Sequence, residues 1–266
     1  MPVMWGTLLG VAALVTALGF IKPVWFVSVG YGYTIAALAA TTAVLGWADL
    51  TVASVTHLVL LFAWGVRLST FLVIRERQAS YQQRPDAIES AGTRWGIRFV
   101  SWIGVALLYL AMFSPAVYVP SGDSEPTGTG AVVRWIGLAV LAVGLVIEVT
   151  ADAQKQAAKR AEPSAFVRTG LFSWVRSPNY LGEILVWVGN LVAGAALLTD
   201  GWSLGIAVTG VLLLVLIMIG ATRRLEWVQG RRYGDQEAFQ SYIRTVPVLI
   251  PWVPIYSVEK TKIPMV

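Results

Sequence analysis

Long apolar stretches, separated by polar connections, dominate the pattern along the chain. A helix needs about 20 mostly apolar residues to cross a bilayer, and seven stretches reach about that length: residues 3–21, 24–47, 51–74, 97–118, 132–151, 181–199 and 202–221. Their residues do not alternate between apolar and polar types, which excludes the strands of an outer-membrane barrel. The first stretch has neither a cationic start nor a small-residue cleavage site, so we interpret it as a span rather than a signal peptide. The pattern predicts an all-α integral membrane protein with about seven transmembrane helices.

The composition supports this class and excludes several functions. Of the 266 residues, 56% are hydrophobic and only 13% are charged, whereas soluble domains are about one quarter charged. Cysteine is absent, which excludes thiolate catalysis and disulfide scaffolds. His57 is the one histidine, so we expect no metal site. We expect this histidine to pack or to hydrogen-bond within its span.

The cationic residues gather on one side of the predicted spans. Most of the 20 Lys and Arg residues lie in residues 75–98, 152–180 and 222–266, whereas the opposite connections carry acidic residues such as Asp49 and Asp200. The positive-inside rule therefore places the N-terminus outside and the C-terminus in the cytoplasm. Membrane topology thus accounts for the net charge of +5, and no nucleic-acid partner is expected. We predict a multi-pass protein of the cytoplasmic (inner) membrane with a polar cytoplasmic mouth.

Two predicted spans contain charged residues that are costly in lipid. Arg67 lies in the third span, where it either faces a partner in a wet cavity or extends its side chain to the cytoplasmic surface. Glu148, Asp152 and Lys155 follow a helical spacing at the end of the fifth span and so share one face. This face is either a solvated, salt-bridged surface or a binding surface. Glu148 favours binding, because a carboxylate in an apolar run needs a donor such as a ribose hydroxyl or an arginine.

The segment that leads into the sixth span combines cations, turn residues and an acidic residue. Arg168 and Arg176 would suit phosphate groups. Asn179 can cap the following helix, and the spacing of Asn179, Glu183 and Asn190 places them on one face. An interfacial anchor would explain the arginines and the aromatic residues here, but not a glutamate within the span.

A second group of cations follows the last span. Arg223 and Arg224 end it, and Tyr242 and Arg244 come later in the tail. These residues either bind anionic lipid headgroups or surround a polyphosphate together with donors from other cytoplasmic segments. The chain has neither a GxGxxG motif nor a phosphate-binding GK[ST] loop, so no soluble nucleotide-binding domain is predicted.

One stretch is typical of a known family. Residues 170–183, GLFSWVRSPNYLGE, resemble the signature of the steroid 5-alpha-reductase C-terminal domain family, in particular its bacterial branch of largely unassigned membrane proteins. Three further segments match the same pattern in the same order: Asp152–Lys155, Tyr242–Thr245 and Leu249–Trp252. The resemblance is strong over residues 130–254 and patchy before them.

The resemblance implies a seven-helix membrane enzyme that uses NADPH to reduce an activated carbon–carbon double bond in a lipid or steroid-like substrate. It implies one membrane domain over residues 1–266, with substrate-side helices in 1–118 and the cofactor-binding half in 130–254. Tyr81 and Glu183 are the catalytic candidates. From the resemblance and the polar pattern together, the residues expected to bind the cofactor are Arg67, Glu148, Asp152, Lys155, Arg168, Arg176, Asn179, Tyr180, Glu183, Arg223, Arg224, Tyr242 and Arg244.

The N-terminal half departs from the family's pattern. Steroid reductases of the family polarise the substrate carbonyl with an N-terminal glutamate and a tyrosine, but no glutamate precedes residue 75 here; Tyr81, Tyr31 and Tyr33 are the available tyrosines. Two alternatives therefore stay open. One is an S-adenosylmethionine-dependent membrane lipid or isoprenyl-cysteine methyltransferase, whose related motif has histidine where this chain has Ser177. The other is a non-catalytic lipid-binding protein. The expected partners are a hydrophobic small-molecule or lipid substrate and membrane lipids, without an obligate protein partner.

Overall fold

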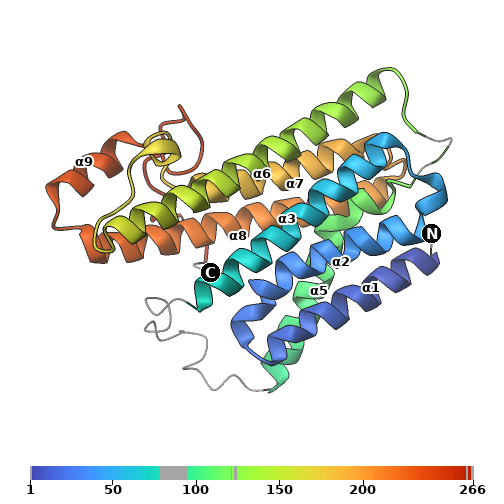
Figure 1. The fold of residues 1–266 in the computed structure, drawn as a ribbon, viewed down its shortest axis with the longest axis horizontal. Helices are drawn as coiled ribbons and strands as arrows, with labels where there is room; N and C mark the ends of the chain where they lie inside the picture. Colours follow the sequence, from blue (N-terminus) through green and yellow to red (C-terminus); the bar gives the residue numbers. More distant parts are fainter. Residues whose placement is uncertain (1, 78–94, 121, 123–124, 262, 265–266) are drawn as a thin grey trace. The chain divides into compact units, whose positions relative to one another are not determined.

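The computed structural model describes residues 2–77, 95–120, 122, 125–261, 263 and 264, and it is helical throughout the membrane-spanning part of these residues. Six of the described helical segments are long and apolar enough to cross a membrane (Figure 1). The predicted class, an all-α multi-pass membrane protein, is confirmed. The α-helices are α1 (Pro2–Thr16), α2 (Val29–Leu45), α3 (Val52–Glu76), α5 (Trp95–Val117), α6 (Thr129–Ala161), α7 (Pro178–Ala195), α8 (Gly201–Tyr233) and α9 (Glu237–Thr245).

Two helices continue well beyond the apolar stretches that predict them. α6 extends past residue 151 to Ala161, and α8 extends past residue 221 to Tyr233. The added turns are rich in Ala, Gln, Lys, Arg and Glu, which favour helix in water as well as in lipid. An apolar pattern detects only the part of a helix that lies in lipid.

The sixth predicted span corresponds to α7, which begins at Pro178, as the fixed φ of proline favours at the first helical position. This helix has 18 residues and carries polar residues along its length. It is therefore not among the six segments that qualify as spans by length and hydropathy. Its crossing of the bilayer, and the orientation of the termini, stay predictions.

The chain forms two compact units. Unit 1 comprises residues 1–138 and 190–211, and unit 2 comprises residues 139–189 and 212–266. The helices α6, α7 and α8 therefore each contribute residues to both units. The predicted division into residues 1–118 and 130–254 is a functional one and stays a prediction.

The helices α1, α2, α3 and α5 pack against one another in unit 1. Gly32 and Gly65 let the backbones of α2 and α3 touch, since a Cβ on Gly32 would lie 2.5 Å from the Gly65 carbonyl oxygen. Tyr31 stacks on Tyr109 of α5 with 4.7 Å between ring centroids, and it meets Trp64 edge-on at 5.2 Å. Small residues at the contact and aromatic rings beside it are typical of helix packing in membranes.

A buried polar network also belongs to unit 1. The fully buried Arg134 places Nε 3.1 Å from a Glu125 carboxylate oxygen, and its Nη2 donates to Ser54 Oγ at 3.1 Å. His57 Nε2 and Asn190 Oδ1 lie 2.8 Å apart, so the expected hydrogen-bonding role of His57 is confirmed. Asn190 Nδ2 donates to the Met112 carbonyl. Asn190 thus serves the packing of unit 1. That it shares one face of its helix with Asn179 and Glu183 stays a prediction from their spacing.

Candidate functional site

The candidate site lies in unit 2, where α6 and α7 make a very close contact. A Cβ on Gly144 would lie 2.6 Å from the Gly182 carbonyl oxygen, and a Cβ on Gly182 would lie 2.7 Å from the Glu148 backbone nitrogen. Only glycine at both positions allows this approach. The contact places Glu148 of α6 directly beside the Gly182–Glu183 turn of α7.

Three buried carboxylates come from these two helices. Glu148, Asp152 and Glu183 are exposed by only 3%, 8% and 8%. Glu148 and Asp152 are one turn apart on α6, as their spacing predicts. A carboxylate is costly to bury unless it is paired or hydrogen-bonded, and its two oxygens can accept more than one bond. Within the described residues, no group of three or more His, Cys, Asp or Glu side chains is placed to hold a metal ion.

The signature segment is tied to α6 and α9 before it enters α7. Gly170 has a φ of +63°, which favours glycine, and the next residue, Leu171, donates its backbone N–H to Gln154 Oε1 at 2.9 Å. The Tyr242 hydroxyl donates to the Phe172 carbonyl at 2.7 Å. These contacts fix the path that leads to Asn179 and Tyr180, which are half-buried in the first turn of α7.

The pKa of Tyr242 is shifted by its surroundings. Burial raises the pKa above its usual range, and the positive charge of Arg176 opposes part of that rise. The phenol therefore stays protonated at physiological pH and keeps donating to Phe172. This geometry gives Tyr242 a positioning role for the signature segment.

Arg176, one of the predicted phosphate ligands, is bonded to several parts of unit 2. Its side chain is 5% exposed, and its Nη2 lies 2.6 Å from a Glu226 carboxylate oxygen and also donates to the Tyr256 carbonyl. The other oxygen of Glu226 accepts from the Val258 backbone N–H at 2.8 Å. In the described conformation, this arginine is held by the segment after α9.

Arg223 is engaged by the same segment. Its Nε donates to the Glu259 carbonyl at 2.9 Å and its Nη1 donates to the Ile263 carbonyl at 2.7 Å. Glu226, which links α8 to Arg176 and Val258, is not among the predicted site residues. A signal is present in the sequence, since Glu226 is the one acidic residue between the arginine pairs 223–224 and 231–232 of α8.

The other predicted residues occupy various positions. Arg168 is exposed, with its guanidinium 5.6 Å from the centre of the Phe166 ring. Arg224 and Arg244 are exposed, and Lys155 is half-buried on α6. Arg67 belongs to α3 in unit 1 and lies 5.4 Å from the centre of the Phe71 ring. Tyr81 lies outside the described residues.

One carboxylate of unit 1 comes directly after residue 75, before which the chain has no glutamate. Glu76 ends α3 and is the first glutamate of the chain. Its two carboxylate oxygens accept from Trp25 Nε1 at 3.1 and 3.0 Å, and one of them lies 3.8 Å from Lys22 Nζ. The N-terminal half therefore does contain a partly buried glutamate, at the end of α3.

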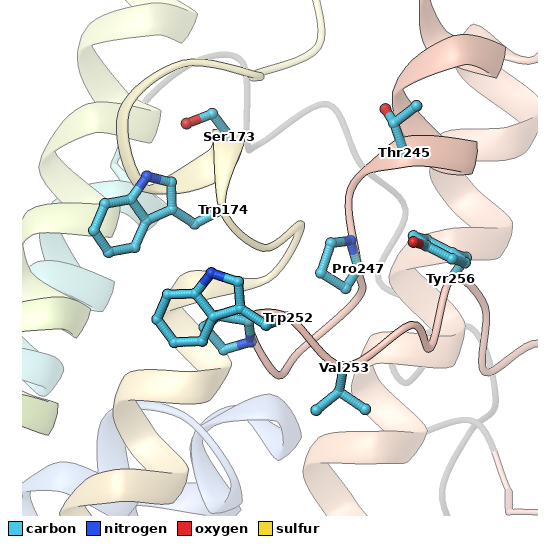
Figure 2. Close-up of a pocket in the computed structure, with 8 residues that line it drawn as sticks. Ser173, Trp174, Thr245, Pro247, Trp252, Val253 and Tyr256 are labelled. Carbon is cyan, nitrogen blue, oxygen red and sulfur yellow. The ribbon is translucent and has the colours of Figure 1, made fainter.

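A cavity of about 400 Å³ opens on unit 2 beside the signature segment (Figure 2). It lies between the turn that precedes α7 and the segment after α9. Its lining residues are Ser173, Trp174, Thr245, Pro247, Pro251, Trp252, Val253 and Tyr256.

Comparison with known proteins gives one family and two relatives. Residues 3–246 match the family described as "Protein of unknown function (DUF1295)". Over 147 residues the chain is 27% identical to the Mus musculus protein 3-oxo-5-alpha-steroid 4-dehydrogenase 1. The aligned residues cover 54% of this chain and 49% of the mouse protein. The Rattus norvegicus protein of the same name is 26% identical, with 54% and 48% covered. The chain thus spans about half the length of these relatives. No solved structure matches.

Proposed function

The chain belongs to the DUF1295 family, and from this premise we propose that it is a membrane reductase that uses NADPH to reduce an activated carbon–carbon double bond of a steroid-like or other lipid substrate. The family membership, together with the likeness to two 3-oxo-5-alpha-steroid 4-dehydrogenases, confirms the steroid 5-alpha-reductase-like resemblance of the signature segment. A dehydrogenase and a reductase name opposite directions of one hydride transfer, so the likeness supports redox chemistry.

The observation that carries the proposal is the set of buried carboxylates at the α6–α7 contact. Glu148, Asp152 and Glu183 offer acceptors in a place where water is scarce, which suits the hydroxyl groups of a ribose. Asn179, one turn before Glu183, has both a donor and an acceptor and suits the carboxamide of a nicotinamide ring. The residues present therefore fit a nicotinamide nucleotide, which would supply the hydride.

The phosphate groups of such a nucleotide need cations. Arg168, Arg224 and Arg244 expose their side chains to solvent and are the residues of unit 2 that we assign to this task. Arg176 and Arg223 already hold carbonyl groups of the segment 256–263, so we assign them to the support of the site. We keep Tyr81 as the proposed proton donor.

Ligand binding tests the proposal directly. The purified protein in nanodiscs is titrated with NADPH, NADH and S-adenosylmethionine by calorimetry, with nicotinamide fluorescence as a second reading. We expect saturable binding of NADPH and no heat from S-adenosylmethionine. Binding of S-adenosylmethionine alone would show a methyltransferase, and binding of neither compound would favour a lipid-binding protein without redox chemistry.

Substrate reduction is the second step of the test. With NADPH bound, a 3-oxo-4-ene steroid and a conjugated enone lipid are supplied, and loss of NADPH absorbance is followed. Oxidation that depends on the enone is expected. NADPH binding without oxidation by any enone would contradict the reductase and leave only nucleotide binding.

A further inference from the structure

The segment after α9 forms a closed loop whose ends are tied together. We call residues 247–256 the aromatic loop. The Val248 backbone N–H donates to the Ile255 carbonyl at 2.9 Å, and the Val253 N–H donates to the Ile250 carbonyl at 3.3 Å. Because these bonds close the loop on itself, its tip is held in one place rather than being free to collapse onto the protein.

The aromatic loop is also bonded to the start of α7. The Arg176 backbone N–H donates to the Pro247 carbonyl at 2.9 Å, and the Ser177 N–H donates to the Val248 carbonyl at 3.0 Å. Arg176 adds a side-chain bond to the Tyr256 carbonyl at the other end of the loop. The loop therefore has a fixed position relative to the helix that follows Ser177.

The tip exposes large apolar side chains. Trp252 is 89% exposed and Trp174, from the signature segment, is 61% exposed; their ring centroids lie 6.5 Å apart. Figure 2 shows the two indole rings next to each other, with Tyr256 on the opposite side of Pro247. Ile250 is also exposed. A bulky residue seldom adopts a positive φ, yet Trp252 has a φ of 62°, and this conformation presents its ring outward.

The composition of the aromatic loop suits an environment less polar than water. Its ten residues, PVLIPWVPIY, contain no charge, and the prolines at 247, 251 and 254 have no N–H group to satisfy. The N–H groups of Val248, Val253 and Ile255 are bonded within the loop. Three of the seven N–H groups of the loop are thus already bonded within it, which lowers the cost of bringing this segment to the edge of a bilayer.

In the sequence, cationic residues precede and follow the aromatic loop, but none lies within it. Arg244 in the last turn of α9 and Lys260 after the loop are both exposed. Tryptophan and tyrosine collect at the headgroup level of membranes, and adjacent cations are attracted to anionic lipids of the cytoplasmic leaflet. An uncharged tip with cations before and after it therefore matches the two layers of a membrane surface, whereas docking to a second protein would not require this arrangement.

We propose that the aromatic loop, together with Trp174, inserts into the headgroup region of a bilayer containing anionic lipid and anchors unit 2 there. The loop is bonded directly to Arg176 and Ser177, just before Asn179. The anchor would therefore set the depth of the first turn of α7 in the membrane. The inference shares Arg244 with the proposed nucleotide site, but it is argued from the loop and Trp174 and does not depend on which ligand unit 2 binds.

The absence of cysteine allows a direct test. Val253→Cys places a nitroxide label on the loop and leaves both tryptophans in place, while Ser241→Cys on the exposed side of α9 is the matched control. Both proteins are reconstituted in vesicles of phosphatidylcholine and phosphatidylglycerol. Electron paramagnetic resonance then measures the collision of each label with oxygen, which prefers lipid, and with a nickel chelate, which prefers water.

We expect oxygen to dominate at residue 253 and the nickel chelate to dominate at residue 241. Adding Trp174→Ser and Trp252→Ser to the Val253→Cys protein should shift that label toward the nickel chelate, while the thermal midpoint confirms that the protein stays folded. Equal nickel access at both sites would overturn the proposal. Spin–spin broadening at residue 253 that unlabelled protein dilutes away would overturn it too, because it would show contact with a second copy.

Discussion

Arg176 is the residue on which the site depends most for its shape. Its backbone and side chain together bind Pro247, Glu226 and Tyr256, and both side chains of the ion pair are nearly buried. Removing one partner of a buried pair leaves the other charge without compensation and costs about 3–5 kcal/mol.

We therefore expect Arg176→Met to lower the stability of the protein by about 3 kcal/mol, since among the described residues Glu226 then keeps only the bond from the Val258 backbone N–H. Thermal unfolding in detergent measures this change. The matched control is Arg168→Met, which removes an exposed arginine and should change stability by less than about 0.5 kcal/mol. Equal melting of the two variants would show that the pair contributes little.

Asn179 and Glu183 decide whether the site binds a nucleotide. If they contact NADPH, Asn179→Ala and Glu183→Gln should each weaken its affinity roughly ten-fold, about 1.5 kcal/mol, the value of a hydrogen bond to a charged group. Calorimetry measures the affinities. Ser164→Ala, an exposed position in the same segment of unit 2, should bind as the parent does. Parental affinity in the Asn179 and Glu183 variants would leave them a purely structural role.

Tyr242 makes the stability sensitive to high pH. Its pKa is raised by burial from the usual 10.0, so above about pH 10 the unfolded chain loses the phenol proton while the folded chain keeps it. The unfolded state then binds fewer protons, and stability falls as pH rises. We expect the thermal midpoint of the parent to drop between pH 9 and about pH 11 more steeply than that of Tyr242→Phe. Parallel profiles would contradict this linkage.

The contact of α6 with α7 is the element that places Glu148 beside Gly182. A methyl group at Gly144 or Gly182 would meet backbone atoms at 2.6–2.7 Å, and such overpacking costs about 1–3 kcal/mol. We expect Gly144→Ala and Gly182→Ala to lower the melting temperature. Gly230→Ala on α8, where no atom lies within 4 Å of the new methyl, should be neutral or stabilising by about 0.5–1 kcal/mol. If Gly230→Ala lowered the melting temperature more than Gly144→Ala or Gly182→Ala, α6 and α7 could move apart without loss of stability.

The elements differ in how well the sequence predicts them. The apolar stretches predict α3 and α5 closely because a membrane span must be apolar wherever it meets lipid. They do not reveal α9, which is short and amphipathic, nor the extension of α6 to Ala161, because helices in water need no continuous apolar run.

The candidate site is predictable only in part, for a related reason. Glu148 and Asp152 share a face by helical spacing alone, so their proximity follows from local geometry. Apart from Glu226 on α8, the side-chain partners of Arg176 and Arg223 lie in the segment after α9, which has no regular structure. No periodicity relates Glu226 to Val258, and only the folded chain shows that these arginines are already engaged.

At the scale of the whole molecule, the orientation can be tested because the chain has no cysteine. Thr127→Cys lies in a connection predicted to be outside, and Ser164→Cys in one predicted to be cytoplasmic. A maleimide that cannot cross membranes should label residue 127 in intact cells and residue 164 only after permeabilisation. The reverse pattern would invert the topology that the positive-inside rule predicts.

The ion pair of Arg134 and Glu125 bears on how the chain is inserted during its synthesis. In the predicted orientation both residues must be carried across the hydrocarbon layer, and a lone arginine at its centre costs about 2.5–3.5 kcal/mol. Glu125 precedes α6 in the connection from α5 and lies 3.1 Å from the guanidinium in the folded protein. As an ion pair the two residues cross without net charge. Without Glu125, which lies before the first residue of α6, the helix would carry Arg134 across uncompensated. The connection that carries Glu125 and the first turns of α6 are therefore expected to cross the hydrocarbon layer together.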